Sequence, residues 1–240
     1  MVEGKGVALM KMDVRRNILE ANEKLARDNN DFFTANRVLA VNVMASPGAG
    51  KTSTILATIE RLRALVKFKV IEGDIASSVD TEKLAAHGID VLQINTGNMC
   101  HLDAVMIGKV LNRFSYDAPS ILFIENVGNL VCPADFSMGE HLNLVIASVP
   151  EGHDKPVKYP GIFRKADAIL LNKIDSRDSE DFDREAFHQT VQRLNRTAPC
   201  FEISCRSGAG LDAWCSWLME QFLTRYFGSR SADQAASQRG

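Results

Sequence analysis

The sequence contains no run of about 18 apolar residues, the length that a membrane-spanning helix requires. It also has no excess of one charge, because 28 Lys and Arg stand against 30 Asp and Glu, for a formal net charge of −2. General nucleic-acid binders and membrane-surface binders usually carry a basic excess, so neither partner class is expected. The first residues contain no apolar stretch of signal-peptide length, and a cytoplasmic location is expected.

Cysteine is scarce, with five residues and no CxxC pair. Small secreted domains use a dense, even set of cysteines as a disulfide framework, which this chain lacks. The thiols are therefore expected to be free, as small buried side chains or as metal ligands. A thiol-redox function is the weakest alternative for the same reason.

Short apolar segments alternate with helical patterns through most of the chain. The predicted strands are residues 37–45, 68–74, 90–95, 120–125, 142–148, 167–172 and 200–204. The predicted helices between them are residues 51–65, 79–87, 102–113, 160–165, 181–195 and 210–226. Continuously apolar strands separated by helices are typical of an α/β fold, in which helices cover both faces of a mostly parallel sheet.

A further helix is predicted at residues 14–33, before the first strand. Its apolar face is formed by Val14, Ile18, Ala21 and Leu25, and we expect this face to pack on the main body. The predicted organisation is a helical extension over 1–36, one α/β domain over 37–227 and a tail over 228–240. The tail has no apolar face and is expected to be disordered.

The segment ASPGAGKTS connects the first strand to the next helix. It contains the predicted nucleotide-binding residues Gly48, Ala49, Gly50, Lys51, Thr52 and Ser53. In a phosphate loop, backbone N–H groups surround the β-phosphate, a lysine reaches the β and γ oxygens, and a hydroxyl binds Mg²⁺. Ala45 stands where the first glycine of the motif is usual, which requires a negative φ there. Because strand, loop, lysine and hydroxyl coincide, we favour a P-loop NTPase over a simple glycine-rich turn.

The segment LNKID places Asn172, Lys173 and Asp175 at the end of a later strand. A carboxylate can accept from the N1–H and the exocyclic amine of guanine, a donor pair that adenine lacks. The lysine stem can cover the base, and the asparagine can brace the loop. Backbone groups of Ser204 and Cys205 follow another strand and offer a second wall for the base. The sequence therefore predicts that the chain binds GTP and GDP.

Carboxylates follow two other strands and are candidate magnesium ligands. Thr52, Asp74 and Glu125 offer a hydroxyl and two carboxylates, a set that Mg²⁺ accepts. Either acid alone would be equally well explained as a solvated strand end. Lys51 and Asp74 are the predicted catalytic residues, and the backbone near Gly128 is expected to respond to a γ-phosphate. No glutamine or arginine stands at an evident catalytic position, so intrinsic hydrolysis is expected to be slow.

Two thiols and an imidazole follow parallel strands and should emerge near the nucleotide. They are Cys100, His101 and Cys132, whose donor types suit Zn²⁺, Ni²⁺ or Cu⁺. Three ligands do not complete a tetrahedral site, but a symmetric dimer would supply up to six. The remaining cysteines are interpreted as core or neighbourhood residues: Cys200, Cys205 and Cys215. The remaining histidines are interpreted as surface or packing residues: His87, His141, His153 and His188.

Six segments together resemble the hydrogenase nickel-incorporation GTPases, the HypB family: ASPGAGKTS, VIEGD, CHLDA, ENVGNLVCPA, SVPEGHDKPVKYP and LNKID. This family belongs with the metallocentre-assembly GTPases, which include the urease accessory protein UreG. The resemblance covers residues 14–226. The segments CHLDA and ENVGNLVCPA are its most specific part, since a UreG-like chain would not be expected to carry them in this form.

The resemblance implies a GTP-dependent homodimer that delivers nickel to the large-subunit precursor of [NiFe]-hydrogenase, together with the partner HypA. It implies nickel or zinc binding at Cys100, His101 and Cys132, and Mg²⁺ binding at Thr52, Asp74 and Glu125. Asp80 falls in the first switch region, and Lys155 lies in a segment that approaches the other protomer in such dimers. The N-terminus has neither the cysteine-rich nickel motif nor the histidine-rich stretch of some members, so nickel storage is not expected.

Gly128 and Cys132 are four residues apart, so one bistable loop could couple the nucleotide state to the metal geometry. Two alternatives remain open at this point. The chain could be a GTPase that serves another metallocentre, such as urease or a cobalamin-dependent enzyme. It could also be a regulatory GTPase switch without a metal, in which the cysteines are incidental.

Overall fold

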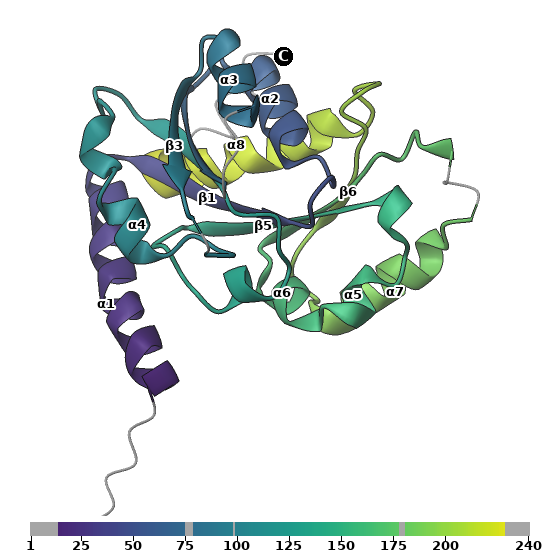
Figure 1. The fold of residues 1–240 in the computed structure, drawn as a ribbon. Helices are drawn as coiled ribbons and strands as arrows, with labels where there is room; N and C mark the ends of the chain where they lie inside the picture. The colour runs from purple at the N-terminus through teal and green to yellow at the C-terminus, as the bar shows by residue number, and fades with distance from the viewer. Residues whose placement is uncertain (1–13, 75–78, 98, 178–180, 229–240) are drawn as a thin grey trace, which may run out of the picture.

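A seven-stranded parallel sheet forms the centre of the molecule (Figure 1), in the order β3-β2-β4-β1-β5-β6-β7. The computed structural model describes residues 14–74, 79–97, 99–177 and 181–228. The strands are β1 Val38–Ala45, β2 Lys67–Asp74, β3 Asp90–Asn95, β4 Ser120–Glu125, β5 Leu142–Ser148, β6 Ala168–Asn172 and β7 Cys200–Glu202. All six strand pairings are parallel. The predicted α/β fold is therefore confirmed.

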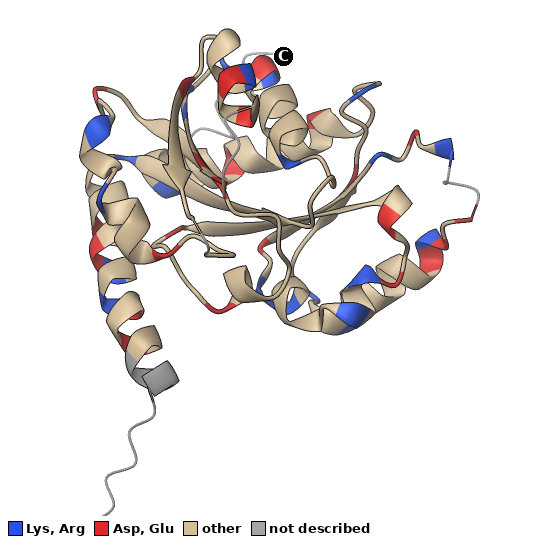
Figure 2. Cartoon of the chain, in the orientation of Figure 1, with Lys and Arg blue, Asp and Glu red and all other residues tan. Residues whose placement is uncertain are grey.

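Helices lie on both faces of the sheet (Figure 1). They are α1 Val14–Ala35, α2 Lys51–Leu62, α3 Val79–Ala86, α4 Ala104–Gly108, α5 Lys155–Lys158, α6 Pro160–Lys165, α7 Arg184–Leu194 and α8 Leu211–Phe227. The described residues also form the 3₁₀ helices η1 Leu111–Arg113, η2 Cys132–Ala134 and η3 Val149–Glu151. None of the helices within the described ranges has the length and apolar content that a membrane crossing requires. Acidic and basic residues are interspersed along α1 and α7 (Figure 2).

The alternation of side chains along β1 explains how one apolar strand serves both layers. All eight residues of β1 are buried. Leu39 and Val41 pack in the core with residues of α2 and α8, whereas Val38 and Ala40 pack with residues of α1 and α4. Successive side chains of a strand point to opposite faces, so a strand covered on both sides must be apolar throughout. This is why the continuous apolar runs located the strands.

The N-terminal helix packs through a different face from the one predicted. Ile18 and Leu25 are 54% and 38% exposed, and Ala21 is exposed as well. Among residues 18–35 of α1, whose side chains the structure describes, the buried positions are Asn22, Ala26, Asn29 and Phe33. The prediction ranked positions by hydrophobicity, but two of these four residues are asparagines. Their side chains pair with backbone groups of the neighbouring loops, which an apolar side chain could not do.

Those asparagine contacts fix α1 beside α4. Asn29 donates from Nδ2 to the carbonyl oxygens of Ala104 and Met138, at 2.9 and 3.0 Å. Asn22 accepts from the N–H of Ala104 at 3.0 Å and donates to the carbonyl of Ser137 at 2.7 Å. Buried backbone groups at the N-terminal end of α4 are thus satisfied by side chains of α1.

Two further sequence predictions differ from the structure. The helix predicted over 102–113 divides into α4 and η1, and α4 ends at Gly108. A Cβ at Gly108 would lie 3.1 Å from Asn29 Oδ1, so the close packing of α1 favours glycine, and glycine weakens a helix. The short helix α5 was not predicted. The predicted tail lies outside the described residues from residue 229 onward. The predicted domain boundaries stay predictions.

The C-terminal ends of the parallel strands meet at one edge of the sheet, where the loops that carry the candidate residues emerge. The first of these loops follows Ala45, which is fully buried. The described non-glycine residues with positive φ are Arg37 and Lys173, so Ala45 meets the condition for alanine at the first loop position.

Candidate nucleotide and metal site

The loop between β1 and α2 is shaped by two glycines. Gly48 has a φ of 77° and Gly50 a φ of 100°, values that favour glycine. Gly50 is also in close contact with a second loop, because a Cβ there would lie 2.5 Å from Asn172 Nδ2. Helix α2 begins directly afterwards at Lys51. A glycine-rich turn that ends at a helix N-terminus presents backbone N–H groups to an anion, as a phosphate requires.

A cavity of about 290 Å³ lies at this loop and contains most of the predicted phosphate and magnesium residues. Its lining residues are Gly48, Gly50, Lys51, Thr52, Ser53, Asp80, Glu125 and Lys173. Asp80 lines the cavity, whereas Asp74 is not among the lining residues. The structure thus brings Thr52 and Glu125 together with Lys51, and it places Asp80, rather than Asp74, in the cavity wall.

Thr52 and Glu125 form the part of this cavity that fits a magnesium ion. Thr52 Oγ1 donates to Glu125 Oε1 at 2.9 Å, and within the described residues Glu125 Oε2 is buried without a hydrogen-bond partner. Burial raises the pKa of Glu125 to about 7, against the opposing effects of Lys51 and of the Thr52 hydrogen bond. A buried carboxylate oxygen with an unused lone pair beside a hydroxyl is a donor set that Mg²⁺ accepts.

Glu72 is a second buried acid beside Glu125, and the sequence did not predict it as a site residue. It is 3% exposed, lies opposite Glu125 in the β2–β4 register and accepts from Thr81 Oγ1 at 2.8 Å. Burial raises the pKa of Glu72 above its ordinary value. Thr81 follows Asp80, so this bond holds the start of α3 against the sheet. An acidic residue inside an otherwise buried strand was the available signal.

The loop after β6 is bonded directly to the phosphate loop. Asn172 Nδ2 donates to the carbonyl of Ala49 at 2.9 Å, and Lys173 Nζ donates to the carbonyl of Gly48 at 2.6 Å. Lys173 adopts a φ of 60°, which is uncommon for a residue with a side chain. The two predicted nucleotide-binding loops therefore form one connected structure, although they are far apart in sequence.

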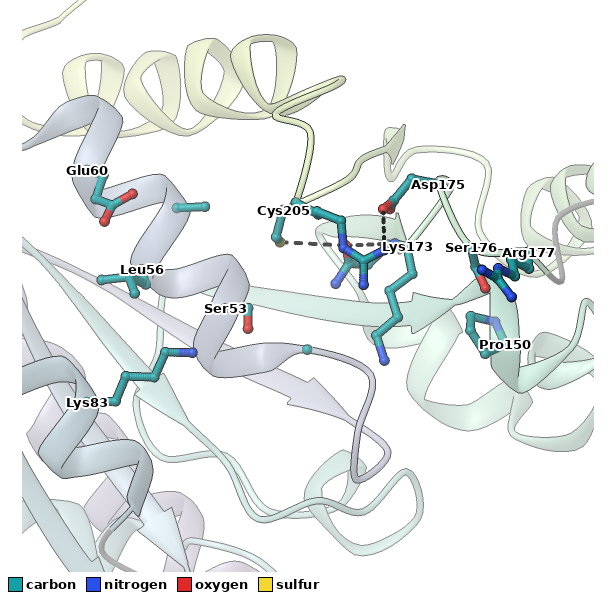
Figure 3. Close-up of a pocket in the computed structure, with 14 residues that line it drawn as sticks. Ser53, Leu56, Glu60, Lys83, Pro150, Lys173, Asp175, Ser176, Arg177 and Cys205 are labelled. Carbon is teal, nitrogen blue, oxygen red and sulfur yellow. Dashed lines mark hydrogen bonds and ion pairs between the residues drawn. The ribbon is translucent and has the colours of Figure 1, made fainter.

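A larger cavity of about 810 Å³ continues from these loops along α2 (Figure 3). On one side it presents Lys173, Asp175 and Cys205, and on the other it presents Ser53 and Leu56 of α2. A cavity of this size is in the range of sites for nucleotide-sized ligands.

Asp175 is fixed in this cavity by the loop after β7. Ser204 Oγ donates to Asp175 Oδ1 at 2.6 Å, and this hydrogen bond holds the pKa of Asp175 below its ordinary value. Asp175 is therefore an ionised acceptor at neutral pH. The backbone wall predicted for Ser204 stays a prediction, and the structure adds a hydroxyl that positions the aspartate. Cys205 likewise presents its thiol, which lies 3.4 Å from Thr54 Oγ1.

The two thiols and the imidazole come together as the sequence predicted. The nearest ligand atoms of Cys100, His101 and Cys132 all lie within 4.8 Å of one another. Cys100 Sγ lies 3.8 Å from His101 Nδ1, and the pKa of Cys100 is raised, mainly because its thiol shares a hydrogen bond with Cys132. Thiolate and imidazole donors at this separation suit Ni²⁺ or Zn²⁺.

His101 is held by a ring contact. It is 6% exposed and stacks on Phe136 with ring centroids 4.1 Å apart and planes 23° from parallel. Burial lowers the pKa of His101, which keeps the imidazole neutral and able to bind a metal. Nε2 is buried and has no hydrogen-bond partner among the residues that the structure describes.

The other cysteines and histidines lie apart from this cluster. Cys215 is buried, and Cys200 is half-buried. His141 is a packing residue, because Nδ1 accepts from the N–H of Ala40 at 3.1 Å and burial lowers its pKa to about 4. His188 lies 2.8 Å from Glu202 and His87 lies 3.8 Å from Glu60, both partly exposed. His153 stands edge-on to the ring of Phe182.

Lys155, at the start of α5, contacts the phosphate loop of its own chain. Its Nζ lies 3.1 Å from Ser46 Oγ and 3.1 Å from Glu151 Oε1, and 5.3 Å from the centre of the Tyr159 ring. Its approach to a second protomer stays a prediction. In the structure, Lys155 donates a hydrogen bond to Ser46 in the phosphate loop of its own chain.

The same arrangement of segments occurs in known proteins. The family model described as CobW/HypB/UreG, nucleotide-binding domain, matches residues 39–202. The hydrogenase maturation factor HypB of Azotobacter vinelandii is 44% identical over 212 residues, which cover 88% of this chain and 70% of that protein. The hydrogenase/urease maturation factor HypB of Helicobacter pylori is 34% identical over 229 residues, which cover 93% and 94% of the two chains.

Two solved structures agree with these sequence comparisons. The hydrogenase maturation factor HypB from Archaeoglobus fulgidus matches with a TM-score of 0.79 at 38% identity, over 85% of this chain and 99% of that one. HypB from Helicobacter pylori in complex with nickel matches with a TM-score of 0.80 at 34% identity, over 86% and 97%. The chain belongs to the HypB family of hydrogenase maturation factors.

Proposed function

We propose that the chain is a GTPase that delivers nickel during the maturation of [NiFe]-hydrogenase, with its nucleotide state controlling dimerisation and metal affinity. The observation that carries this proposal is the position of one segment. Residues 125–132 begin with Glu125 at the phosphate cavity and end with Cys132 in the thiol cluster. A ligand that changes this segment at one end can therefore change the metal site at the other.

Guanine is assigned to the 810 Å³ cavity and the triphosphate to the 290 Å³ cavity. Asp175 accepts from the base, the Lys173 stem covers its face, and Asn172 holds the loop. Lys51 contacts the β- and γ-phosphates, together with N–H groups of the phosphate loop. Ser53, which follows Thr52 in the first turn of α2, is assigned to the same phosphate site.

Magnesium is assigned to Thr52 and Glu125, and it would neutralise charge that develops on the phosphates during hydrolysis. Asp74 remains the proposed third ligand and catalytic partner of Lys51. Asp80 is a second candidate for that role, because it lines the cavity. Glu72 positions Asp80 through the Thr81 hydrogen bond.

Nickel is the cargo and is assigned to Cys100, His101 and Cys132, where zinc would bind with the same donors. Each protomer supplies three ligands, and a twofold axis through the cluster would supply six. The proposed partners are a second copy of the chain, HypA and the hydrogenase large-subunit precursor, in the cytoplasm. GTP would favour the dimer that holds nickel, and hydrolysis would let the metal leave.

A nickel titration of the reduced, metal-free protein tests this proposal. Thiolate-to-nickel absorbance would be followed once with Mg-GDP and once with a non-hydrolysable GTP analogue. We expect a thiolate band whose affinity or stoichiometry differs between the two nucleotides. Cys132→Ala should weaken the band and Cys215→Ala should leave it unchanged. Absence of a thiolate band in both nucleotide states would favour a metal-free switch instead.

A second candidate is service to a urease-type metallocentre. The relative from Helicobacter pylori is named a hydrogenase/urease maturation factor, and it matches nearly the full length of both chains. Binding assays with a hydrogenase large-subunit precursor and with metal-free urease, run side by side, separate the two clients. Exclusive binding of the urease would replace the hydrogenase assignment.

A further inference from the structure

The backbone next to the metal ligands is bonded to the segment after β4 by asparagine side chains. We propose that Asn126 and Asn129 are positioning residues that transmit the state of the phosphate loop to Cys100, His101 and Cys132. This proposal rests on the proposed function, because it requires that the nucleotide changes the affinity for nickel. It identifies the chemical links through which that change passes.

Asn126 connects the ligand segment to the centre of the sheet. The residue is fully buried, and its Oδ1 accepts from the N–H of Leu102, which directly follows His101, at 3.0 Å. Its Nδ2 donates to Asn42 Oδ1 at 3.2 Å, and Asn42 lies in β1, the strand that leads into the phosphate loop. Both ends of the amide are therefore used. A buried amide that loses such a partner is strongly disfavoured, so the two segments move together.

Asn129 connects the two thiol-bearing segments to each other. Its Nδ2 donates to the carbonyl oxygen of Cys100 at 3.2 Å. Its Oδ1 accepts from the N–H of Val131, the residue before Cys132, at 2.9 Å. One side chain thus bonds to the backbone beside both thiols. The separation of the two sulfur atoms, which decides the metal geometry, depends on where Asn129 lies.

Gly128 lies between the asparagines and contacts the phosphate loop itself. A Cβ at Gly128 would lie 2.9 Å from Cγ and 3.1 Å from the backbone nitrogen of Pro47. At the start of the same segment, Glu125 accepts from Thr52. The segment is therefore in contact with the phosphate loop at two points and with the ligand segment at two others. A shift that follows nucleotide exchange must move both asparagines.

The links end on backbone atoms and not on the ligand side chains. Removal of an asparagine side chain therefore leaves all three metal donors in place. A loss of transmission is then distinguishable from a loss of ligands. Loss of ligands would lower the nickel affinity in both nucleotide states, whereas loss of transmission would bring the two affinities together.

The test compares the nickel affinity with Mg-GDP and with a non-hydrolysable GTP analogue in Asn129→Ala and Gly128→Ala. Coupling between sites typically changes affinity by about 5- to 150-fold, and we expect a ratio in this range for the unaltered protein. In both variants the ratio should fall to about twofold or less, while a thiolate-to-nickel band remains. Asn129 is only half-buried, and Gly128→Ala adds a single methyl group, so both variants should fold.

Asn195→Ala is the matched control. Asn195 also joins several backbone groups, with Nδ2 donating to the carbonyls of Phe163 and Ala166, but it lies between α7 and β7. The control should keep the full ratio. An unchanged ratio in Asn129→Ala and Gly128→Ala would overturn the role of the asparagines and leave the proposed gating intact. Equal affinities in the unaltered protein would overturn the gating itself, and the transmission with it.

Discussion

The two sides of the nucleotide edge differ in how their polar groups are satisfied. On the proposed guanine side, which comprises the loops after β6 and β7, Asn172, Lys173 and Asp175 already have hydrogen-bond partners within the chain. On the β4 side, Glu125 Oε2 and His101 Nε2 are buried without partners, in the part of the chain that the structure describes. Among the described residues, one more buried side-chain atom has no hydrogen-bond partner, Ser120 Oγ, which lies at the opposite end of β4 from Glu125.

This difference indicates which side is rigid and which responds to ligands. The guanine side is preorganised, because its loops hold one another whether or not a base is bound. On the β4 side, unsatisfied donors and acceptors are completed only by what binds there, so its conformation and stability depend on the ligand. A nucleotide-controlled metal site needs both properties, a fixed anchor for the base and a neighbouring segment that can change.

The largest expected effect comes from the guanine side. Asp175→Asn places an amide donor opposite the donors of guanine and removes two charge-assisted hydrogen bonds, each worth about 1.5–3 kcal/mol. We expect GDP to bind roughly 10²–10⁴-fold more weakly by calorimetry. Asp212→Asn, an exposed aspartate on α8, should bind GDP normally. Unchanged GDP affinity in Asp175→Asn would mean that the base does not bind in the 810 Å³ cavity.

On the β4 side, the buried carboxyl of Glu125 should make stability depend on pH. Its pKa is about 7 instead of the ordinary 4.5, so the folded state prefers the protonated form. This stabilisation is fully present below pH 4.5 and is lost as the pH rises through about 7, at about 1.4 kcal/mol per pH unit, or about 3 kcal/mol in all.

The urea concentration that unfolds Glu125→Gln should therefore be similar at pH 5 and at pH 8. The magnesium-free parent protein should unfold at a lower urea concentration at pH 8 than at pH 5. Mg²⁺ with GDP should restore part of the stability of the parent at pH 8, because it pairs with the carboxylate. Glu60→Gln, an exposed position on α2, serves as the control. If Glu125→Gln kept the pH dependence of the parent, another group would be responsible.

Gly50 joins the two sides, and its substitution should disturb both. Gly50→Ala introduces a Cβ 2.5 Å from Asn172 Nδ2 at a φ of 100°. The strained φ costs about 1–2 kcal/mol, and displacement of Asn172 about 1 kcal/mol more. Gly88→Ala is the control, since its φ is 71° but no atom lies within 4 Å of the added Cβ. Chemical unfolding should show the larger loss for Gly50→Ala, and only that variant should lose GDP affinity. Equal losses would mean that Asn172 moves freely.

The sequence predicted the strands of this fold well, because buried parallel strands are apolar along their whole length. It also predicted that Cys100, His101 and Cys132 meet, since segments that follow parallel strands emerge at one edge. It did not predict the hydrogen bond of Lys173 to Gly48 or that of Ser204 to Asp175, because these partners lie on loops that are distant in sequence. Contacts of this kind depend on loop conformation, which hydrophobic periodicity does not describe.

The helix α1 shows the limit of periodicity more directly. The pattern selected Ile18 and Leu25 as packing residues, and both are exposed. The packing face instead uses asparagines, because the surface that α1 covers presents backbone carbonyl and N–H groups at the start of α4. A helix that covers loops needs polar side chains where a helix that covers a sheet needs apolar ones.

The smallest expected effect concerns the buried face of α1, formed by Asn22, Ala26, Asn29 and Phe33. This face contacts the start of α4, which follows the segment with Cys100 and His101. Asn29→Ala leaves the carbonyl oxygens of Ala104 and Met138 without their donor, and each buried polar group without a partner costs about 1–3 kcal/mol. Leu25→Ser removes an exposed apolar side chain and should change the free energy of unfolding by about 0.5 kcal/mol or less. Urea unfolding should therefore rank Asn29→Ala clearly below Leu25→Ser. The reverse order would mean that the exposed face of α1 is covered in the folded protein in solution.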